Sequence, residues 1–147
     1  MMAISLFSVN VRSIRDKRRC ASTLGFLASQ KCDVYMLQEC SIPYTQSYKH
    51  LEQQWTLGPS FWSGGNSSRS VGVATLVRGK CFTVDSVTEL EGGRALVVDG
   101  SWAGEPVRLI NVYAPSDVGE RRELLQRLRP QLVTSRTILM GGTLTVY

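Results

Sequence analysis

Short apolar segments that end in polar residues are the feature that most constrains the fold of this chain. Residues 3–9 are rich in strand-forming side chains, and residues 34–37 form a compact apolar run typical of a strand buried on both faces. Between them, apolar positions recur at helical spacing from Ile14 to Ala28. This order predicts a β-α-β unit at the start of the chain.

The rest of the chain predicts further strands and a second long helix. Residues 41–70 are a mixed stretch with a short helix near 48–55. A helix is expected from Ser116 to about Pro130, where proline should bend or end it, and residues 137–140 predict a last short strand. Four more strand-like segments have the spacing of antiparallel hairpins: residues 72–77, 81–87, 94–99 and 107–112. The expectation is an α/β fold with a mixed sheet and flanking helices.

Composition excludes several classes of protein. With 43% hydrophobic and 20% charged residues, the chain is globular rather than disordered. It has neither a long apolar run nor a basic, apolar N-terminal leader, so we expect a soluble intracellular protein and no membrane partner, with the nucleus left open. The four cysteines form no Cys-x-x-Cys pair and His50 is the single histidine, so reduced, packed thiols are favoured over a zinc site.

The positive charge of the chain is concentrated in one short stretch. Seventeen basic and twelve acidic side chains give a net charge of +5. Residues 12–19, called the basic segment below, contain Arg12, Arg15, Lys17, Arg18 and Arg19 against the single acid Asp16. Contact with a nucleic-acid backbone is one interpretation, because arginine and lysine bind phosphate in any sequence context. A solvated helix face is the alternative.

Polar residues follow the apolar strands where each strand ends. Asn10, Glu39, Tyr113 and Thr143 all occupy such positions. In open α/β sheets, sites form outside the carboxyl ends of the strands, so these residues could meet at one rim. Glu39 is the most informative, because a carboxylate directly after a buried strand is costly unless it meets a cation, and Mg²⁺ prefers oxygen ligands. The alternative is a solvated glutamate at the end of a strand.

Six of these segments occur in the order seen in the endonuclease/exonuclease/phosphatase superfamily. The chain most resembles the N-terminal part of the apurinic-endonuclease-like domain of non-LTR (LINE-type) retrotransposons. The resemblance implies a four-layer α/β sandwich of the DNase I-like type, with residues 1–147 as a single truncated domain. The segments are Ser8-Val9-Asn10-Val11-Arg12, Val34-Tyr35-Met36-Leu37-Gln38-Glu39, Gly72-Val73-Ala74-Thr75-Leu76, Gly93-Arg94, Asn111-Val112-Tyr113-Ala114-Pro115 and Ile138-Leu139-Met140-Gly141-Gly142.

The resemblance also implies roles for individual residues. Glu39 matches the family's metal-binding glutamate, which holds Mg²⁺ or Mn²⁺, and Asn10 matches the active-site asparagine beside the metal. Tyr113 matches the tyrosine that faces the scissile phosphate, and Arg94 matches an arginine near the site. DNA is the partner implied, with Arg12 and Arg15 as candidate contacts. Arg69, in the Gly- and Ser-rich loop 63–70, is a further candidate, although that composition is also typical of any surface loop.

The departures from the family pattern concern the catalytic set. The family continues from Gly-Gly into Asp-Phe-Asn, whereas this chain has Thr143-Leu144-Thr145, and the later Ser-Asp-His segment has no counterpart. Because general acid–base groups contribute about 10²–10⁴-fold each, we expect no independent nuclease activity. A non-enzymatic remnant that binds nucleic acid or protein is the alternative. An exposed apolar sheet face is expected to cause self-association.

Overall fold

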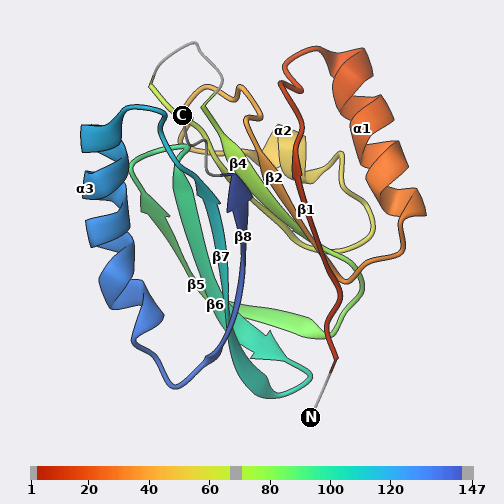
Figure 1. Cartoon of the computed structure of the whole chain (residues 1–147). Coiled ribbons are helices and arrows are strands. Elements are labelled where there is room, and N and C mark those ends of the chain that lie inside the picture. Colours follow the sequence, from red (N-terminus) through yellow and green to blue (C-terminus); the bar gives the residue numbers. More distant parts are fainter. Residues whose placement is uncertain (1–2, 67–70, 144–147) are drawn as a thin grey trace.

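The computed structural model describes residues 3–66 and 71–143 and arranges them in four layers (Figure 1). Two four-stranded sheets pack face to face, and a helix covers the outer face of each. The first sheet has the strand order β1 (Leu6–Asn10), β2 (Val34–Gln38), β4 (Val73–Val77) and β3 (Ser60–Ser63). The second has the order β5 (Phe82–Leu90), β6 (Ala95–Trp102), β7 (Glu105–Tyr113) and β8 (Thr137–Thr143).

The predicted β-α-β unit is present. Strands β1 and β2 pair in parallel, with Leu6 opposite Val34 and Asn10 opposite Gln38. Helix α1 (Lys17–Ser29) connects them and begins where the Asp16 carboxylate accepts hydrogen bonds from the backbone N–H groups of the first turn. The basic segment therefore contains both a turn and the start of α1.

The remaining helices are α2 (Lys49–Glu52), α3 (Val118–Leu128) and a 3₁₀ turn at Arg129–Leu132. Asp117, rather than the expected Ser116, caps α3, because its carboxylate accepts the N–H of Glu120. Pro130 lies within the 3₁₀ turn that ends the helix, as proline in a helical pattern predicts. None of the described helices is long and apolar enough to cross a membrane.

Three apolar clusters hold the layers together. Between the sheets, residues such as Met36 and Val73 pack against Leu96 and Leu109 of the second sheet. Leu24 and Leu27 of α1 cover the outer face of the first sheet. Leu124 and Leu128 of α3 cover the outer face of the second. The central strands β2 and β4 of the first sheet are therefore covered on both faces and buried along their whole length, whereas β5 at the edge of the second sheet is exposed from Thr83 to Glu89.

Local patterning gave an incomplete account of the sheets. The strands form two sheets, as the resemblance to a four-layer sandwich implied, and the turn at Arg78 and Gly79 carries the chain from β4 of the first sheet to β5 of the second. The segments 72–77 and 81–87 are therefore not a hairpin, although β5–β6 and β6–β7 are. Strand β3 was missed, since its four residues lie inside the polar stretch 41–70. The expected open sheet face is also absent from the described residues, because the two sheets cover each other.

An ion-pair cluster joins the strands of the second sheet. Asp99 of β6 lies opposite Arg108 of β7 and accepts hydrogen bonds of 2.7 and 2.9 Å from its guanidinium group. Arg136 approaches Asp99 at 3.6 Å and Asp85 at 3.2 Å. The register of β5 against β6 shifts between Val84 and Ser86, at Asp85. The cluster thus fixes this bulge to the segment that precedes β8.

Candidate active site

The carboxyl ends of four strands meet at one end of the sandwich. Asn10 pairs with Gln38 in the first sheet, and Tyr113 pairs with Thr143 in the second. The two sheets are joined at this level, because the Thr143 hydroxyl donates a 3.0 Å hydrogen bond to Oε1 of Gln38. Glu39 directly follows Gln38. The structure therefore brings together Asn10, Glu39 and Tyr113, which the sequence placed in three separate segments.

A buried polar network holds these strand ends in place. Gln38 and Asn111 are 1% and 0% exposed, and Nε2 of Gln38 donates a 2.9 Å hydrogen bond to Oδ1 of Asn111. The Asn111 amide group in turn donates to the backbone carbonyls of Leu37 and Ala74 at 3.2 and 2.9 Å. No buried side-chain polar atom among the described residues lacks a hydrogen-bond partner. A fully satisfied network of this kind fixes one relative position of the two sheets.

The backbone at Glu39 is held in a conformation that is uncommon for glutamate. Its φ is 58°, and Arg12 and Ser13, in the facing turn, have φ of 52° and 79°. The Ser13 N–H donates a 2.7 Å hydrogen bond to the Glu39 carbonyl. Left-handed conformations of non-glycine residues cost about 1–3 kcal/mol each and cluster at functional sites. The Glu39 side chain is partly exposed and makes no ion pair or hydrogen bond with another described residue.

The basic segment begins beside Glu39. Val11 and Ile14 donate backbone hydrogen bonds of 3.0 Å to Gln38 and Cys40, so residues 11–14 run along residues 38–40. The Arg12 N–H donates to Oδ1 of Asn10 at 3.1 Å, which leaves the Asn10 Nδ2 group as the donor on that side chain. A groove of about 260 Å³ follows, lined by Arg15 and Lys17 and also by His50 from α2. The sequence analysis did not predict that His50 would lie beside the basic segment.

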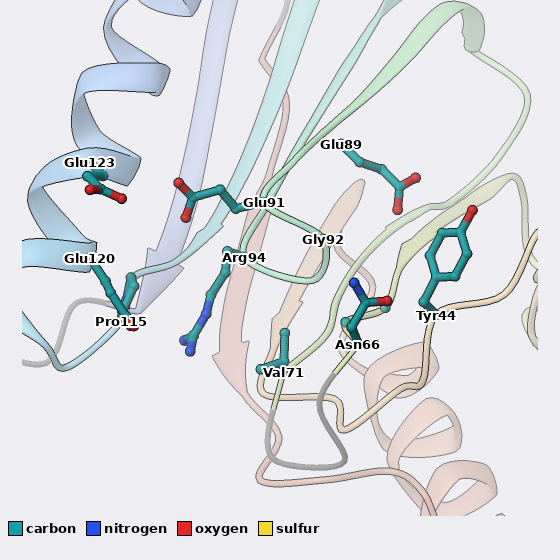
Figure 2. A pocket seen from close by; sticks show the side chains of 12 residues that line it. Tyr44, Asn66, Val71, Glu89, Glu91, Gly92, Arg94, Pro115, Glu120 and Glu123 are labelled. Atoms are coloured by element: carbon teal, nitrogen blue, oxygen red, sulfur yellow. The ribbon is translucent and has the colours of Figure 1, made fainter.

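Arg94 lies against Tyr113. Its guanidinium carbon is 5.0 Å from the centre of the Tyr113 ring, within cation–π range, and the Tyr113 N–H donates to the Arg94 carbonyl at 2.6 Å. Arg94 also lines a cavity of about 720 Å³ whose wall includes Glu89, Glu91, Glu120 and Glu123. Figure 2 shows Arg94 between Pro115 and Val71, with Tyr44 and Asn66 on the far side of the cavity. The four carboxylates disfavour the binding of phosphate in this cavity. Arg94 is the one cationic side chain among the described residues that line it.

The fit of a metal ion to this end of the fold rests on one carboxylate. Mg²⁺ is often bound through one or two carboxylates and keeps several water ligands, and no cationic side chain among residues 3–66 and 71–143 forms an ion pair with the Glu39 carboxylate. The described residues contain no group of three His, Cys, Asp or Glu side chains placed to hold a metal. The residues present therefore fit a hydrated hard cation held by Glu39 and do not fit a closed cage such as a structural zinc site.

Cys40, the cysteine beside Glu39, is fully buried. Burial raises the pKa of the Cys40 thiol far above its ordinary value, and the neighbouring Cys20 raises it further. Burial also raises the pKa of Cys20. Both are free thiols, as are the partly buried Cys32 and the exposed Cys81. Cys20 and Cys40 fit the expectation of packed thiols, but the exposed Cys81 does not. The buried Cys40 places a neutral thiol rather than a thiolate next to the candidate metal site.

One predicted residue, Arg69, lies outside the described residues, so its contact with DNA stays a prediction. Asn111 is a residue of this site that the sequence analysis did not select, whereas Thr143 was one of its strand-end residues and only its contact with Gln38 was not expected. A signal for Asn111 was present, since a lone asparagine interrupts the apolar run Leu109-Ile110-Asn111-Val112 of a buried strand. Such a residue needs buried partners, and the network supplies them.

Solved structures share this four-layer arrangement. The catalytic domain of Xenopus laevis APE2 matches with a TM-score of 0.70 at 18% sequence identity, over 97% of this chain and 59% of that chain. D. rerio TDP2 complexed with single strand DNA product matches with a TM-score of 0.68 at 16% identity, over 95% of this chain and 59% of that chain. The chain therefore has the same DNase I-like α/β fold as these structures, as the resemblance predicted for the fold.

The sequence is also similar to part of a transposon protein. The chain is 29% identical over 150 residues to the transposon TX1 uncharacterized 149 kDa protein of Xenopus laevis. The match covers 96% of this chain but 11% of that protein. No family model matches the sequence. The chain thus spans a small part of its transposon relative and about three fifths of the two solved structures.

Proposed function

We propose that this chain is the N-terminal part of a retrotransposon-type DNA endonuclease domain, a Mg²⁺-dependent phosphodiester hydrolase whose catalytic set these residues do not complete. The observation that carries the proposal is the meeting of Asn10, Glu39 and Tyr113 at one end of the sandwich, beside the basic segment. The likeness to a transposon protein supports the mobile-element origin. Fold alone would not support an activity, because one fold hosts many functions.

The three residues have complementary roles in this proposal. Glu39 holds the metal ion, which when bound would neutralise charge on the phosphoryl group. Asn10 directs Nδ2 towards the substrate, because its Oδ1 is occupied by the Arg12 N–H. Tyr113 presents its hydroxyl to the phosphate, with its ring held by Arg94. Neutral donors placed in advance around a phosphoryl group stabilise developing negative charge without reorganisation.

Asn10, Glu39 and Tyr113 do not supply every chemical group that hydrolysis of a phosphodiester requires. Hydrolysis needs a base that activates water and a donor or cation for the departing oxygen. The described residues provide no group of three His, Cys, Asp or Glu side chains that could hold a metal ion, so Glu39 is not part of such a cluster. Thr143 stands where the family has aspartate and is already bound to Gln38. We therefore propose that the chain binds DNA and a divalent cation but does not cleave DNA unaided.

Plasmid nicking tests the catalytic part of this proposal. Supercoiled plasmid is incubated with the purified chain and Mg²⁺, in parallel with Glu39→Gln, with EDTA, and with Glu105→Gln as a control on an exposed carboxylate of β7. No nicking above the protein-free rate is expected from any sample. Nicking that disappears in Glu39→Gln and EDTA but survives in Glu105→Gln would mean that the catalytic set is complete, contrary to the proposal.

DNA binding tests the part that concerns the partner. Fluorescence anisotropy with a labelled duplex should give an affinity that falls steeply with salt concentration, because phosphate contacts release counterions. The double variant Arg12→Ala/Arg15→Ala should bind more weakly and with a shallower salt dependence. Arg121→Ala/Arg122→Ala on α3 removes the same charge elsewhere and should change binding much less. If both double variants lost the same DNA affinity, the loss would reflect the lower net charge alone. That result would contradict a DNA interface at the basic segment.

A non-enzymatic nucleic-acid-binding module is the second candidate. The observation that favours it is the groove lined by Arg15, Lys17 and His50, which places three basic groups together without any carboxylate. In that case Glu39→Gln should leave DNA affinity unchanged both with and without Mg²⁺. In the endonuclease-type proposal, Mg²⁺ should tighten binding by the wild-type chain, and Glu39→Gln should abolish that gain.

A further inference from the structure

The groove beside the basic segment contains polar groups that the roles of Asn10, Glu39 and Tyr113 do not use. It is formed by the start of α1 and the turn before it, by the segment 41–43 that follows β2, and by α2. Among the described residues that line it, none is aspartate or glutamate. The groove is therefore a cationic pocket whose wall begins two residues after Glu39.

Several polar side chains of this groove have no partner within the protein. Lys17 and His50 are exposed, and neither side chain forms an ion pair or hydrogen bond with another described residue. Ser41 is only 8% exposed, yet its hydroxyl group has no hydrogen-bond partner in residues 3–66 and 71–143 either. Nearly buried hydroxyl groups are usually hydrogen-bonded, so this one indicates a bound partner from outside the chain.

The backbone at Ser41 supports the same interpretation. Its φ is 57°, in the left-handed region that non-glycine residues adopt at a cost of about 1–3 kcal/mol and that clusters at ligand-binding sites. An anion that accepts hydrogen bonds would contact both the Ser41 hydroxyl and the cations of the groove. Serine, lysine and arginine are typical contacts of phosphate groups in nucleic-acid complexes.

The charged groups that face His50 are all cationic. Arg15 of the turn and Lys17 of α1 line the groove with it. Cys20 of α1 is the other titratable lining residue, and burial raises the pKa of its thiol, which keeps it neutral. The lining residues of segment 41–43 are uncharged. On α2 itself, the charged neighbours of His50 do not line the groove.

Protonation of His50 would add a third positive charge to the groove. Histidine is the side chain whose ordinary change of charge falls between about pH 5 and pH 8. The imidazolium form donates hydrogen bonds from both ring nitrogens, whereas the neutral form donates from one. A phosphate bound between these groups therefore favours the protonated form, and protonation in turn favours phosphate.

We propose that this groove binds a backbone phosphate of DNA, with protonated His50 as one of its donors, so that DNA binding takes up a proton from solvent. The inference rests on the proposed binding of DNA at the basic segment. It adds a phosphate position beyond the one proposed at Glu39 and Tyr113, and it makes DNA affinity dependent on pH. The affinity should rise as pH falls, because each added cationic contact strengthens binding to the phosphate backbone.

Fluorescence anisotropy with a labelled duplex at constant salt tests the role of His50. The wild-type chain should bind about three- to tenfold more tightly at about pH 6 than at about pH 8. His50 is the single histidine of the chain, so His50→Gln should remove this dependence and bind weakly at both pH values. His50→Arg should bind tightly at both. Lys49→Gln, which removes a cation of α2 that does not line the groove, should keep the full pH dependence.

The imidazole Cε1–H resonance of His50 gives a second readout by NMR. Saturating duplex should move the midpoint of its pH titration upwards, whereas inorganic phosphate at the same phosphate concentration should not, because it lacks the contacts of the neighbouring backbone. An equal shift with inorganic phosphate would show a site for the free anion and would overturn the proposal.

The outcomes separate this inference from the proposed function. Salt-dependent DNA binding that does not change with pH, or that changes equally in the wild-type chain and His50→Gln, would overturn the role of His50 alone. Absence of salt-dependent DNA binding at both pH values would overturn the DNA interface at the basic segment together with this inference.

Discussion

Gln38 of the first sheet donates a 2.9 Å hydrogen bond to Asn111 of the second, and both side chains are almost fully buried. Each residue lies close in sequence to a candidate site residue, Glu39 in one case and Tyr113 in the other. The bond therefore helps to set the separation between Glu39, the proposed metal ligand, and Tyr113, whose hydroxyl is proposed to face the phosphate. Its loss should affect the site before it affects the fold as a whole.

Asn111→Leu should lower the free energy of unfolding by about 1–3 kcal/mol, because Gln38 and the carbonyls of Leu37 and Ala74 lose a buried partner. Adding Gln38→Leu should restore part of that loss, since removing both partners of a buried pair costs less than removing one. Urea unfolding measures both changes, with Asn66→Ala on the exposed surface as the control. The network would be contradicted if the double variant lost more unfolding free energy than the two single variants lose in sum.

Glu39→Asn should stabilise the protein by a few tenths of a kcal/mol to about 1 kcal/mol, because asparagine tolerates the positive φ of 58° better than glutamate does. The same change should abolish any rise in melting temperature caused by millimolar MgCl₂. Differential scanning calorimetry with and without the ion measures both effects. A variant that is less stable than wild type without metal would show that the backbone at residue 39 is unstrained.

Asp99→Asn should reduce stability at neutral pH and have little effect in acid. Hydrogen bonds from Arg108 lower the pKa of Asp99, against the opposing effect of its burial. A depressed folded-state pKa contributes stability above the unfolded pKa of about 3.9, and this contribution disappears as pH falls through the folded-state value. Denaturant unfolding at pH 7 should give a loss of about 1–3 kcal/mol, and the two proteins should converge below pH 4. A constant difference across this range would exclude a charge effect.

Gly141→Ala should destabilise the protein by about 1–3 kcal/mol, because a Cβ atom there would lie 3.0 Å from both Sδ of Met36 and Oγ of Ser8 in the tightly packed space between sheets. Gly25→Ala is the matched control, since nothing lies within 4 Å of its Cβ position on α1. That substitution should stabilise α1 by up to about 1 kcal/mol. Thermal unfolding of the two variants should therefore shift in opposite directions, and a common direction would contradict the packing.

Most elements could be predicted from local pattern, and the errors share a cause. The β-α-β unit and the two hairpins of the second sheet follow from apolar runs and glycine turns within a few residues. The division into two sheets depends instead on packing between distant segments such as β2 and β7. Strand β3 has no apolar periodicity of its own and is defined by pairing with β4. Pairing partners far apart in sequence leave no local signal.

The candidate site was predictable to a similar degree. Glu39, Asn10 and Tyr113 could be selected because each follows an apolar strand, and their closeness follows from parallel strands ending together. The contribution of His50 to the groove beside the basic segment could not be predicted from the sequence, because it depends on how α2 packs. Likewise, Gln38 and Thr143 meet only because the two sheets face each other.

The bulge at Asp85 has a consequence for the size of any assembly. A sheet that could pair at both edges would add molecules without limit and form a filament. At β5 the register shift between Val84 and Ser86 and the charges of Asp85 and Glu89 block the addition of a further strand, so the second sheet cannot grow at this edge. Asp85 therefore does more than pair with Arg136, because it also protects the β5 edge against pairing with another chain.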